Sequence, residues 1–456
     1  MHSRPQSIEL SNGLPGLAPR GQFALRRAAV DNAGSRFRLT LSFIGLTVYL
    51  WVIHSSKAPI AAEAIGVGLF GLLLLPRPVI LPPVLWWFGA FLIWSAIGWT
   101  QSEAPATTME ALLDHGKLWL IFLVAANVAH SRRDLTVLMI TWLGIFALYP
   151  VRGTLFNIVS GISTQGRYSW NFIFSNPNDM AALILPILAI SISVLQAPQS
   201  KWIRLSALAG TIILPFIIFA TQSRGGILAL ATMALLILIQ HRKKFRIFAV
   251  LFVAGGVIAL LAPPEVWNRL SNLRNVTDTE TIAQADEYGS AEQRYEIWKV
   301  GSAIARDHPI FGAGLGAYPE VHGSYAEFGN FNPTARGQRD THSTYLNVLA
   351  ETGLPGATLL MGMLLSVLIS GRKMVRSLIR VDPVFSTQLR TLLIGLVAFM
   401  QACIFATMHH VAFLYLYLAV VATAIEIGRR TLLAAHPLRR LSAQRQSPES
   451  SLLIGV

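Results

Sequence analysis

The sequence predicts an all-α protein that crosses a membrane about twelve times. Of its 456 residues, 53% are hydrophobic and only 13% are charged. Soluble proteins usually contain about 25% charged residues, so a chain with half that fraction is not expected to form ordinary water-facing domains. Apolar runs recur along the chain with short polar breaks, which is the pattern of successive transmembrane helices.

The first segment, residues 1–38, is polar and lacks the apolar stretch and small-residue cleavage site of a signal peptide, so we expect a cytoplasmic tail. Several apolar runs are shorter than the roughly 20 residues that cross the hydrocarbon layer, so their ends are defined only to within a few residues. The spans are expected near residues 39–54, 59–75, 79–99, 111–129, 135–151, 177–196, 202–220, 225–240, 245–262, 354–370, 389–407 and 410–428.

With the tail at residues 1–38, these spans divide the chain into five segments. Spans one to nine occupy residues 39–262, and a large outer loop occupies residues 263–341. A re-entry helix and spans ten to twelve occupy residues 342–428, and residues 429–456 form a second tail.

The charges indicate the orientation in the membrane. The chain has 37 Lys and Arg against 23 Asp and Glu, a net charge of +14. With the N-terminus inside, the inner segments hold 25 basic and 6 acidic residues, and the outer segments hold 12 and 17. The positive-inside rule therefore predicts that both tails are cytoplasmic. The basic charge reports this topology, and no polar basic domain suggests a nucleic-acid partner.

The outer loop is long enough to form a small, partly helical unit. Ser290-Ala-Glu-Gln293 has the form of a capping box, and apolar residues recur at helical spacing after it. Arg294 and Trp298 share one face of this predicted helix, because they are four residues apart. The following Phe311-Gly-Ala-Gly-Leu-Gly316 has the wrong glycine spacing for a dinucleotide site, so we expect a flexible turn against the membrane surface.

Ser223-Arg224-Gly225-Gly226 opens the eighth span on its outer side. Ser223 can cap this helix, whose first N–H groups then form a site for an anion. Arg224 can make bidentate contacts with a phosphate there. The alternative is an interfacial arginine that extends to lipid headgroups.

A short helix is expected to begin at Asp340 or Thr341 and to break at Gly353 and Pro355. This helix would place His342 and Tyr345 on the face that packs inward. A neutral imidazole suits a general base that removes a proton from a sugar hydroxyl. A single histidine is, however, more often a structural hydrogen-bonding group.

Several other cations lie on the outer side, where positive charge is scarce. They are expected to contact an anionic partner or to be solvated or ion-paired, and Ser223 and Tyr345 are further candidates for substrate contact. These outer cations are Arg152, Arg167, Arg294 and Arg339.

The sequence predicts neither a metal site nor a cofactor. It contains no HExxH, CxxC or Walker A pattern, and the first outer loop carries no paired carboxylates. The single cysteine, Cys403, is expected to be a small buried hydrophobe. His409 and His410 have no carboxylate nearby in sequence, so we expect them to pack at the membrane interface.

Four motifs together resemble the bacterial O-antigen ligase / O-antigen polymerase superfamily. The resemblance covers about residues 220–370 and is most specific from His342 to Gly356. Its motifs are Ser223-Arg-Gly-Gly226, Arg294 with Trp298, Asp307-His-Pro-Ile-Phe-Gly-Ala-Gly-Leu-Gly316, and His342-Ser-Thr-Tyr-Leu-Asn-Val-Leu-Ala-Glu-Thr-Gly-Leu-Pro-Gly356.

This resemblance implies an inner-membrane glycosyltransferase of the GT-C type that needs no metal and has its active site on the periplasmic side. The donor would be an undecaprenyl-diphosphate-linked O-antigen, and in the ligase branch the acceptor would be the lipid A–core oligosaccharide. The family's catalytic histidine falls on His342, and its two motif arginines fall on Arg224 and Arg294. Arg167 is a further candidate for binding the donor diphosphate.

Three other functions stay open at this point. Within the superfamily, the chain could be an O-antigen polymerase or a protein O-oligosaccharyltransferase. A twelve-span transporter or flippase is the alternative of another class, but it would place ionisable residues at mid-span, where this chain has few.

Overall fold

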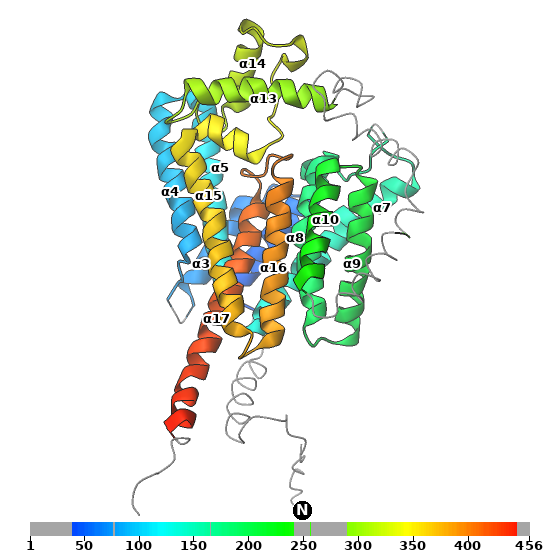
Figure 1. Ribbon diagram of the computed structural model, residues 1–456, viewed down its shortest axis with the longest axis vertical. Helices are drawn as coiled ribbons and strands as arrows, with labels where there is room; N and C mark the ends of the chain where they lie inside the picture. The colour runs from blue at the N-terminus through cyan, green and yellow to red at the C-terminus, as the bar shows by residue number, and fades with distance from the viewer. Residues whose placement is uncertain (1–38, 76–77, 165, 241–255, 257–289, 445–456) are drawn as a thin grey trace, which may run out of the picture.

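The computed structural model describes residues 39–75, 78–164, 166–240, 256 and 290–444. Within these ranges the chain is helical, and its one β-type pairing is an isolated bridge between Thr164 and Arg167. The helices stand side by side in a bundle, and a lobe formed by α13 (Ser290–Asp307) and α14 (Tyr318–Phe328) lies across one end (Figure 1). The all-α class predicted from the sequence is therefore confirmed for the described chain.

Eleven of the twelve expected spans overlap a helix in the described ranges. The ninth, at residues 245–262, lies outside the described residues except for Gly256. The helices that coincide with expected spans are α2 (Leu41–Ser55), α3 (Ala61–Leu73), α4 (Pro83–Gly98), α5 (Pro105–Val128), α6 (Arg132–Phe146), α8 (Pro177–Gln196), α9 (Lys201–Ala220), α10 (Arg224–Gln240), α15 (Thr344–Leu378), α16 (Pro383–Ala402) and α17 (Ala412–Gln444).

The number of helices that can cross a membrane is smaller than twelve in the described chain. Eight helical segments there are long and apolar enough to do so. The apolar helices α2, α3 and α10 have 15, 13 and 17 residues. At about 1.5 Å per residue these three fall short of the roughly 30 Å hydrocarbon layer. The structure thus supports a polytopic membrane protein with eight candidate spans.

The fifth span was expected to end at residue 151, but the helical backbone continues beyond it to Val159. The helical path continues from α6 through a π-helical turn, Ala147–Val151, into α7 (Arg152–Val159). Pro150 lies inside this turn and cannot donate a backbone hydrogen bond. A π-turn absorbs the missing bond, so proline bends the path here instead of ending it.

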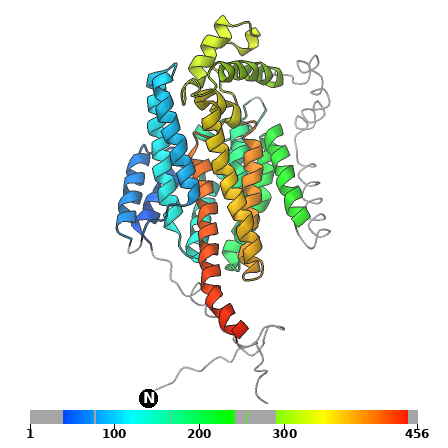
Figure 2. The same cartoon turned by 60° about the vertical axis from the view of Figure 1, so that its left-hand side comes forward.

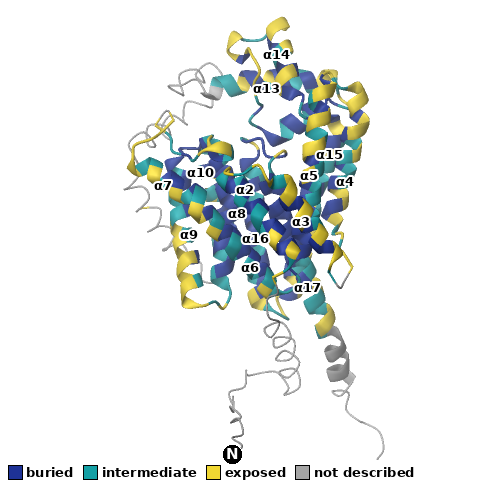
Figure 3. Ribbon diagram, turned by 180° about the vertical axis from the view of Figure 1, so that it is seen from behind, coloured by how far each residue is buried: buried dark blue, intermediate teal, exposed yellow. Residues whose placement is uncertain are grey.

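The centre of the bundle is formed by α8, α16 and α17. In the most apolar stretch of each helix, 78% of α8, 67% of α16 and 83% of α17 is buried within the protein, whereas only 28% of α9 is buried (Figure 3). The exposed side chains of α9 include Trp202 and Ile212. An apolar outer surface of this kind is suited to contact with lipid, whereas the central helices pack against other helices.

The lobe has a small hydrophobic core of its own. Val300 and Ile304 of α13 and Tyr318 of α14 are fully buried in it. The helix expected from Ser290 is confirmed, and it ends at Asp307, two residues before Pro309. The lobe lies at the end of the bundle opposite the C-terminal part of α17 (Figure 2).

The glycine-rich turn at residues 311–316 is not a flexible surface turn, as expected from the sequence, but a buried one. Ala313 and Leu315 are 0% and 1% exposed. Gly314 donates its N–H to the Glu351 carbonyl oxygen at 3.0 Å and has φ +113°. A Cβ on Gly312 would lie 2.2 Å from the Glu351 carbonyl carbon. The glycines are therefore explained by positive φ and by close approach to α15.

The helix α15 is interrupted at Gly353, where the sequence predicts a break. Gly353 has φ +67° and ψ −173°, which separates a short first helix from the long second one. Leu354 donates its N–H to the Pro309 carbonyl oxygen at 2.9 Å, so the segment after α13 occupies the break. This junction holds the start of α15 against the lobe.

Candidate active site

His342 precedes α15 in a left-handed backbone conformation, with φ +48°. The expectation of a helix starting at Asp340 or Thr341 is wrong, because α15 begins at Thr344 with Ser343 as its N-cap. The Thr341 hydroxyl accepts the Ser343 N–H at 3.1 Å and donates to the Ser343 carbonyl oxygen at 2.9 Å. These local bonds favour a turn over helix, so His342 and Tyr345 do not share a helical face.

The turn that carries His342 is anchored to the segment between α16 and α17. The Thr344 hydroxyl donates to the Ala406 carbonyl oxygen at 2.7 Å and accepts the Met408 N–H at 2.9 Å. The Thr344 N–H lies 2.9 Å from the carbonyl oxygen of Cys403, which is buried as predicted. A left-handed conformation at a non-glycine residue costs about 1–3 kcal/mol and persists only where the surrounding structure holds it.

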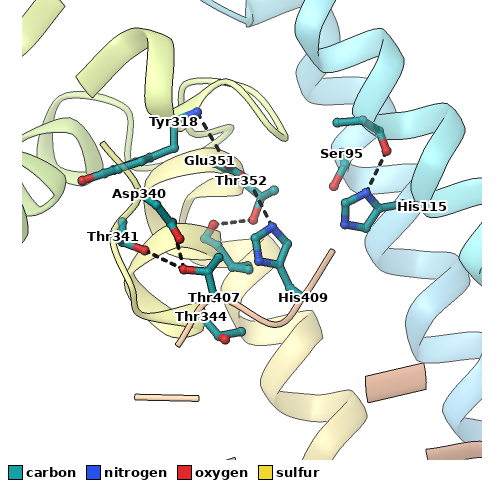
Figure 4. Close-up of polar contacts among 12 residues, drawn as sticks. Ser95, His115, Tyr318, Asp340, Thr341, Thr344, Glu351, Thr352, Thr407 and His409 are labelled. Atoms are coloured by element: carbon teal, nitrogen blue, oxygen red, sulfur yellow. Dashed lines mark hydrogen bonds and ion pairs between the residues drawn. The ribbon is translucent and has the colours of Figure 1, made fainter. Parts of the chain in front are cut away.

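Asp340 lies beside the His342 ring. Its Oδ2 is 3.6 Å from His342 Nδ1, and its Oδ1 accepts a hydrogen bond of 2.8 Å from the Thr407 hydroxyl (Figure 4). Burial lowers the pKa of His342, the Asp340 carboxylate opposes this shift, and the Arg294 guanidinium adds to it. The imidazole is therefore neutral near pH 7, which is the form that can accept a proton.

The Ser223-Arg-Gly-Gly226 segment starts α10 as the sequence predicts. The Ser223 hydroxyl accepts the Gly226 N–H at 3.2 Å, which is the expected N-terminal cap. A Cβ on Gly226 would lie 2.5 Å from the Ala181 Cβ, and one on Gly225 would lie 2.8 Å from the Phe405 ring. Both glycines thus allow the start of α10 to pack closely, and Arg224 stands half-buried at this point.

Arg167 attaches the loop before α8 to the turn before α10. Its Nε donates to the Thr221 carbonyl oxygen at 2.9 Å, and its Nη2 donates to Asn178 Oδ1 at 2.8 Å. The Gln222 side chain returns a bond to the Gly166 carbonyl oxygen at 2.8 Å. Arg167 therefore lies next to the Ser223–Arg224 turn, although 56 residues separate Arg167 from Ser223 in the sequence.

Arg294 of α13 interacts with groups on both the His342 turn and α8. Its guanidinium interacts electrostatically with His342 and with Asp179, and Arg167 also interacts with Asp179. Asp179 belongs to the first turn of α8, and its Oδ1 is buried without a hydrogen-bond partner. Asp179 therefore interacts with Arg167 of the loop before α8 and with Arg294 of the lobe.

One chain of contacts joins the α10 start to the His342 turn. Gly225 packs against Phe405, whose ring stacks on Trp298 with 6.4 Å between ring centroids. The Trp298 indole N–H then donates to the Thr341 carbonyl oxygen at 2.8 Å. Arg294 lies one turn before Trp298 on α13. The structure therefore brings together the motifs that carry Arg224, Arg294 and His342.

Three other predicted site residues lie elsewhere or are already bonded. Arg339 is exposed, and its Nε donates to the Arg336 carbonyl oxygen at 3.2 Å. Arg152 is exposed at the first residue of α7. The Tyr345 hydroxyl donates to the Met400 carbonyl oxygen at 2.7 Å, so it anchors α15 to α16.

The sequence interpretation of His409 as an interfacial residue is wrong, whereas His410 is exposed and that interpretation stays a prediction for it. His409 Nε2 lies 3.4 Å from Glu351 Oε2, and both side chains are 3% exposed (Figure 4). The His409 ring stacks on His115 of α5, with centroids 5.6 Å apart. Burial lowers the pKa of His409 to about 4. The missed signal was Glu351, because an acidic residue between apolar positions requires polar partners.

Glu351 contacts three groups: His409, Tyr318 of the lobe and Asn347 of its own helix, α15. Besides His409, its Oε1 accepts the Tyr318 N–H from the lobe at 3.3 Å, and the Asn347 amide lies 3.2 Å from its oxygens when oriented to donate. In the described residues no three His, Cys, Asp or Glu side chains are grouped so that they could hold a metal ion.

Fold and site together define a polytopic helical membrane protein whose half-buried arginines and a histidine gather at one end of its bundle. Residues 209–361 match a family model described as O-antigen ligase. This match supports membership of the chain in the O-antigen ligase/polymerase family. The matched range contains Arg224, Arg294 and His342. No curated protein matches the chain.

Proposed function

We propose that this protein is an O-antigen ligase that transfers O-antigen polysaccharide from undecaprenyl diphosphate to the lipid A–core oligosaccharide. The observation that supports the proposal is that Phe405 and Trp298 join the segments that carry Arg224, Arg294 and His342, within the range that matches the O-antigen ligase family model. Lipopolysaccharide biosynthesis would be the process that this transfer completes.

In the proposed reaction His342 acts as the general base. Its neutral imidazole accepts the proton of an acceptor hydroxyl, and the hydroxyl oxygen forms a bond to the anomeric carbon of the donor sugar. The bond between that carbon and the diphosphate oxygen breaks, and undecaprenyl diphosphate leaves with the electron pair. A single displacement on the face opposite the leaving group inverts the anomeric configuration.

The arginines would stabilise the negative charge that develops on the diphosphate. Arg224 and Arg294 have planar guanidinium groups that can bind phosphate oxygens in pairs, and Arg167 is bonded to Thr221 in the turn before Arg224. The first turn of α10 adds backbone N–H groups and the positive end of the helix dipole. Arginines and a helix N-terminus together supply this stabilisation in a metal-independent GT-C mechanism.

The proposed orientation follows the charges of the sequence. The positive-inside rule favours a cytoplasmic location for both tails, in the inner membrane of a bacterium, and a periplasmic location for the lobe. The active site would then face the periplasm, at the membrane surface where a lipid-linked diphosphate lies.

The test is to incubate the purified protein with lipid-linked glycan, with and without lipid A–core. The ligase predicts a product only when lipid A–core is present. Growth of the lipid-linked glycan without acceptor would identify a polymerase, and transfer to Ser or Thr of an added protein would identify a protein O-oligosaccharyltransferase. Movement of lipid-linked glycan across reconstituted vesicles without any transfer would identify a flippase and contradict the proposal.

A further inference from the structure

Asp340 is held beside His342 by hydrogen bonds of its own. Asp340 uses both carboxylate oxygens: Oδ2 faces His342 Nδ1 at 3.6 Å, and Oδ1 accepts the Thr407 hydroxyl at 2.8 Å. The Thr407 hydroxyl lies 3.4 Å from the hydroxyl of Thr341, which also binds the backbone on the far side of His342. A small hydroxyl network thus holds the carboxylate beside one particular nitrogen of the ring.

An imidazole that serves as a base needs one fixed tautomer. A carboxylate facing Nδ1 favours the tautomer with hydrogen on Nδ1, which leaves the lone pair of Nε2 free to accept a proton. The 3.6 Å contact is longer than a hydrogen bond, and catalytic contacts in proteins without substrate often shorten when substrate binds. His342 adopts a left-handed backbone conformation beside this carboxylate, at the cost of local strain.

Several charged or titratable groups of the described residues interact with the pair. Arg294 of α13 interacts electrostatically with His342, and Asp179 of α8 interacts electrostatically with Asp340. Tyr318 of α14 and the neutral rings of His409 and His410 also interact electrostatically with Asp340. In the described chain Asp340 is thus the one carboxylate placed within 4 Å of His342.

We propose that Asp340 is a positioning residue for His342, because it holds the ring with hydrogen on Nδ1 and stabilises the imidazolium that forms when Nε2 accepts the acceptor's proton. Thr407 holds Asp340 in turn. This inference rests on the proposed function only for the rate of transfer, because the effect of Asp340 on the His342 ring exists without substrate.

The first experiment titrates His342 without any glycan. The full-length protein is treated with diethyl pyrocarbonate, which modifies neutral imidazole, and the modified fraction of His342 is measured against pH by mass spectrometry. Asp340→Asn should move the midpoint down by about 0.5–1 pH unit, since a nearby carboxylate stabilises the protonated ring. Glu103→Gln is the matched control, because Glu103 Oε1 lies 3.7 Å from a different histidine, His308. Equal midpoints in wild type and Asp340→Asn would overturn the inference.

The second experiment measures transfer. A lower pKa gives Asp340→Asn more neutral imidazole at any given pH, so a change in the neutral population of the ring cannot by itself lower the plateau rate. A positioning role predicts a kcat about 10- to 100-fold lower with little change in KM, as is usual when the group that orients a catalytic histidine is lost. Asp340→Glu should restore part of the rate, and Thr407→Val should lower it several-fold.

The two experiments separate the possible failures. An inactive wild type with a shifted midpoint in Asp340→Asn would contradict the proposed function and leave the pairing of Asp340 with His342 intact. An active wild type with an unchanged kcat in Asp340→Asn would contradict the positioning role. If Asp340→Asn does not fold, as judged by its elution and melting temperature, Thr407→Val and Asp340→Glu decide the question by the same readouts.

Discussion

The Trp298 indole N–H donates a hydrogen bond of 2.8 Å to the carbonyl oxygen of Thr341, which directly precedes His342. This bond joins two segments that are 43 positions apart and belong to the lobe and to the start of α15. Arg294 lies one turn before Trp298 on the same helix. Helix α13 of the lobe therefore carries Arg294 and also anchors the turn that holds His342.

Trp298→Phe tests this link. Phenylalanine keeps the ring stacked on Phe405 but removes the N–H donor, so the His342 turn loses one of its anchors. We expect the free energy of unfolding to fall by about 1 kcal/mol and the rate of glycan transfer to fall about 10-fold, because small displacements of catalytic groups are costly. Trp202→Phe, on the exposed face of α9, is the control. A wild-type rate for Trp298→Phe would show that the bond does not position the site.

Arg167→Lys tests the attachment of the loop to the α10 start. Lysine cannot reproduce the two bonds that Nε and Nη2 make to the Thr221 carbonyl oxygen and to Asn178. The KM for the lipid-linked donor should rise about 10-fold, since the Ser223–Arg224 turn loses support and the site loses a guanidinium. The exposed Arg306 at the end of α13 provides the control Arg306→Lys. Unchanged donor KM in Arg167→Lys would remove Arg167 from the diphosphate site.

Gly226→Ala tests the close packing at the α10 start. The added Cβ would lie 2.5 Å from the Ala181 Cβ, so α8 and α10 must move apart. We expect a loss of about 1–3 kcal/mol in the free energy of unfolding, measured by thermal or denaturant melting in detergent. Gly144→Ala in α6 is the matched control, because nothing lies within 4 Å of its added Cβ. Equal melting of the two variants would contradict the packing argument.

The pH dependence of transfer should report His342. Burial lowers its pKa below the usual 6.5, the Asp340 carboxylate opposes this shift and the Arg294 guanidinium adds to it, so the midpoint of the acidic limb should lie below pH 6.5. Removing the positive charge with Arg294→Gln makes protonation of His342 easier, so its pKa rises and the acidic limb moves to higher pH. A limb that moves to lower pH in Arg294→Gln would place Arg294 away from the ring.

The sequence predicted those features that depend on local pattern. Eleven expected spans overlap helices of the described chain, the Ser223 cap and the break at Gly353 are present, and Cys403 is buried. Each of these follows from hydrophobic runs, from capping chemistry, or from the permissive backbone of glycine. The boundaries shifted where a proline began a helix, as at Pro105 and Pro383, or was absorbed within one, as at Pro150.

Features of the site that depend on distant contacts could not be predicted. The left-handed His342 results from the Thr341 hydroxyl and from anchors beyond residue 400, which no local pattern reveals. Glu351 and His409 are 58 positions apart, so their contact had no sequence signal beyond the buried charge itself. The glycine-rich turn was mistaken for a surface turn because its partner, Glu351, lies in another helix. Only the folded chain brings these groups together.

The most direct test of the central claim is glycan transfer by purified His342→Ala, assayed with lipid-linked O-antigen and lipid A–core beside the wild-type protein. Loss of the general base should lower the transfer rate about 10²- to 10⁴-fold while the variant still melts as a folded protein and still binds the lipid-linked donor. Transfer by folded His342→Ala at the wild-type rate would contradict the account.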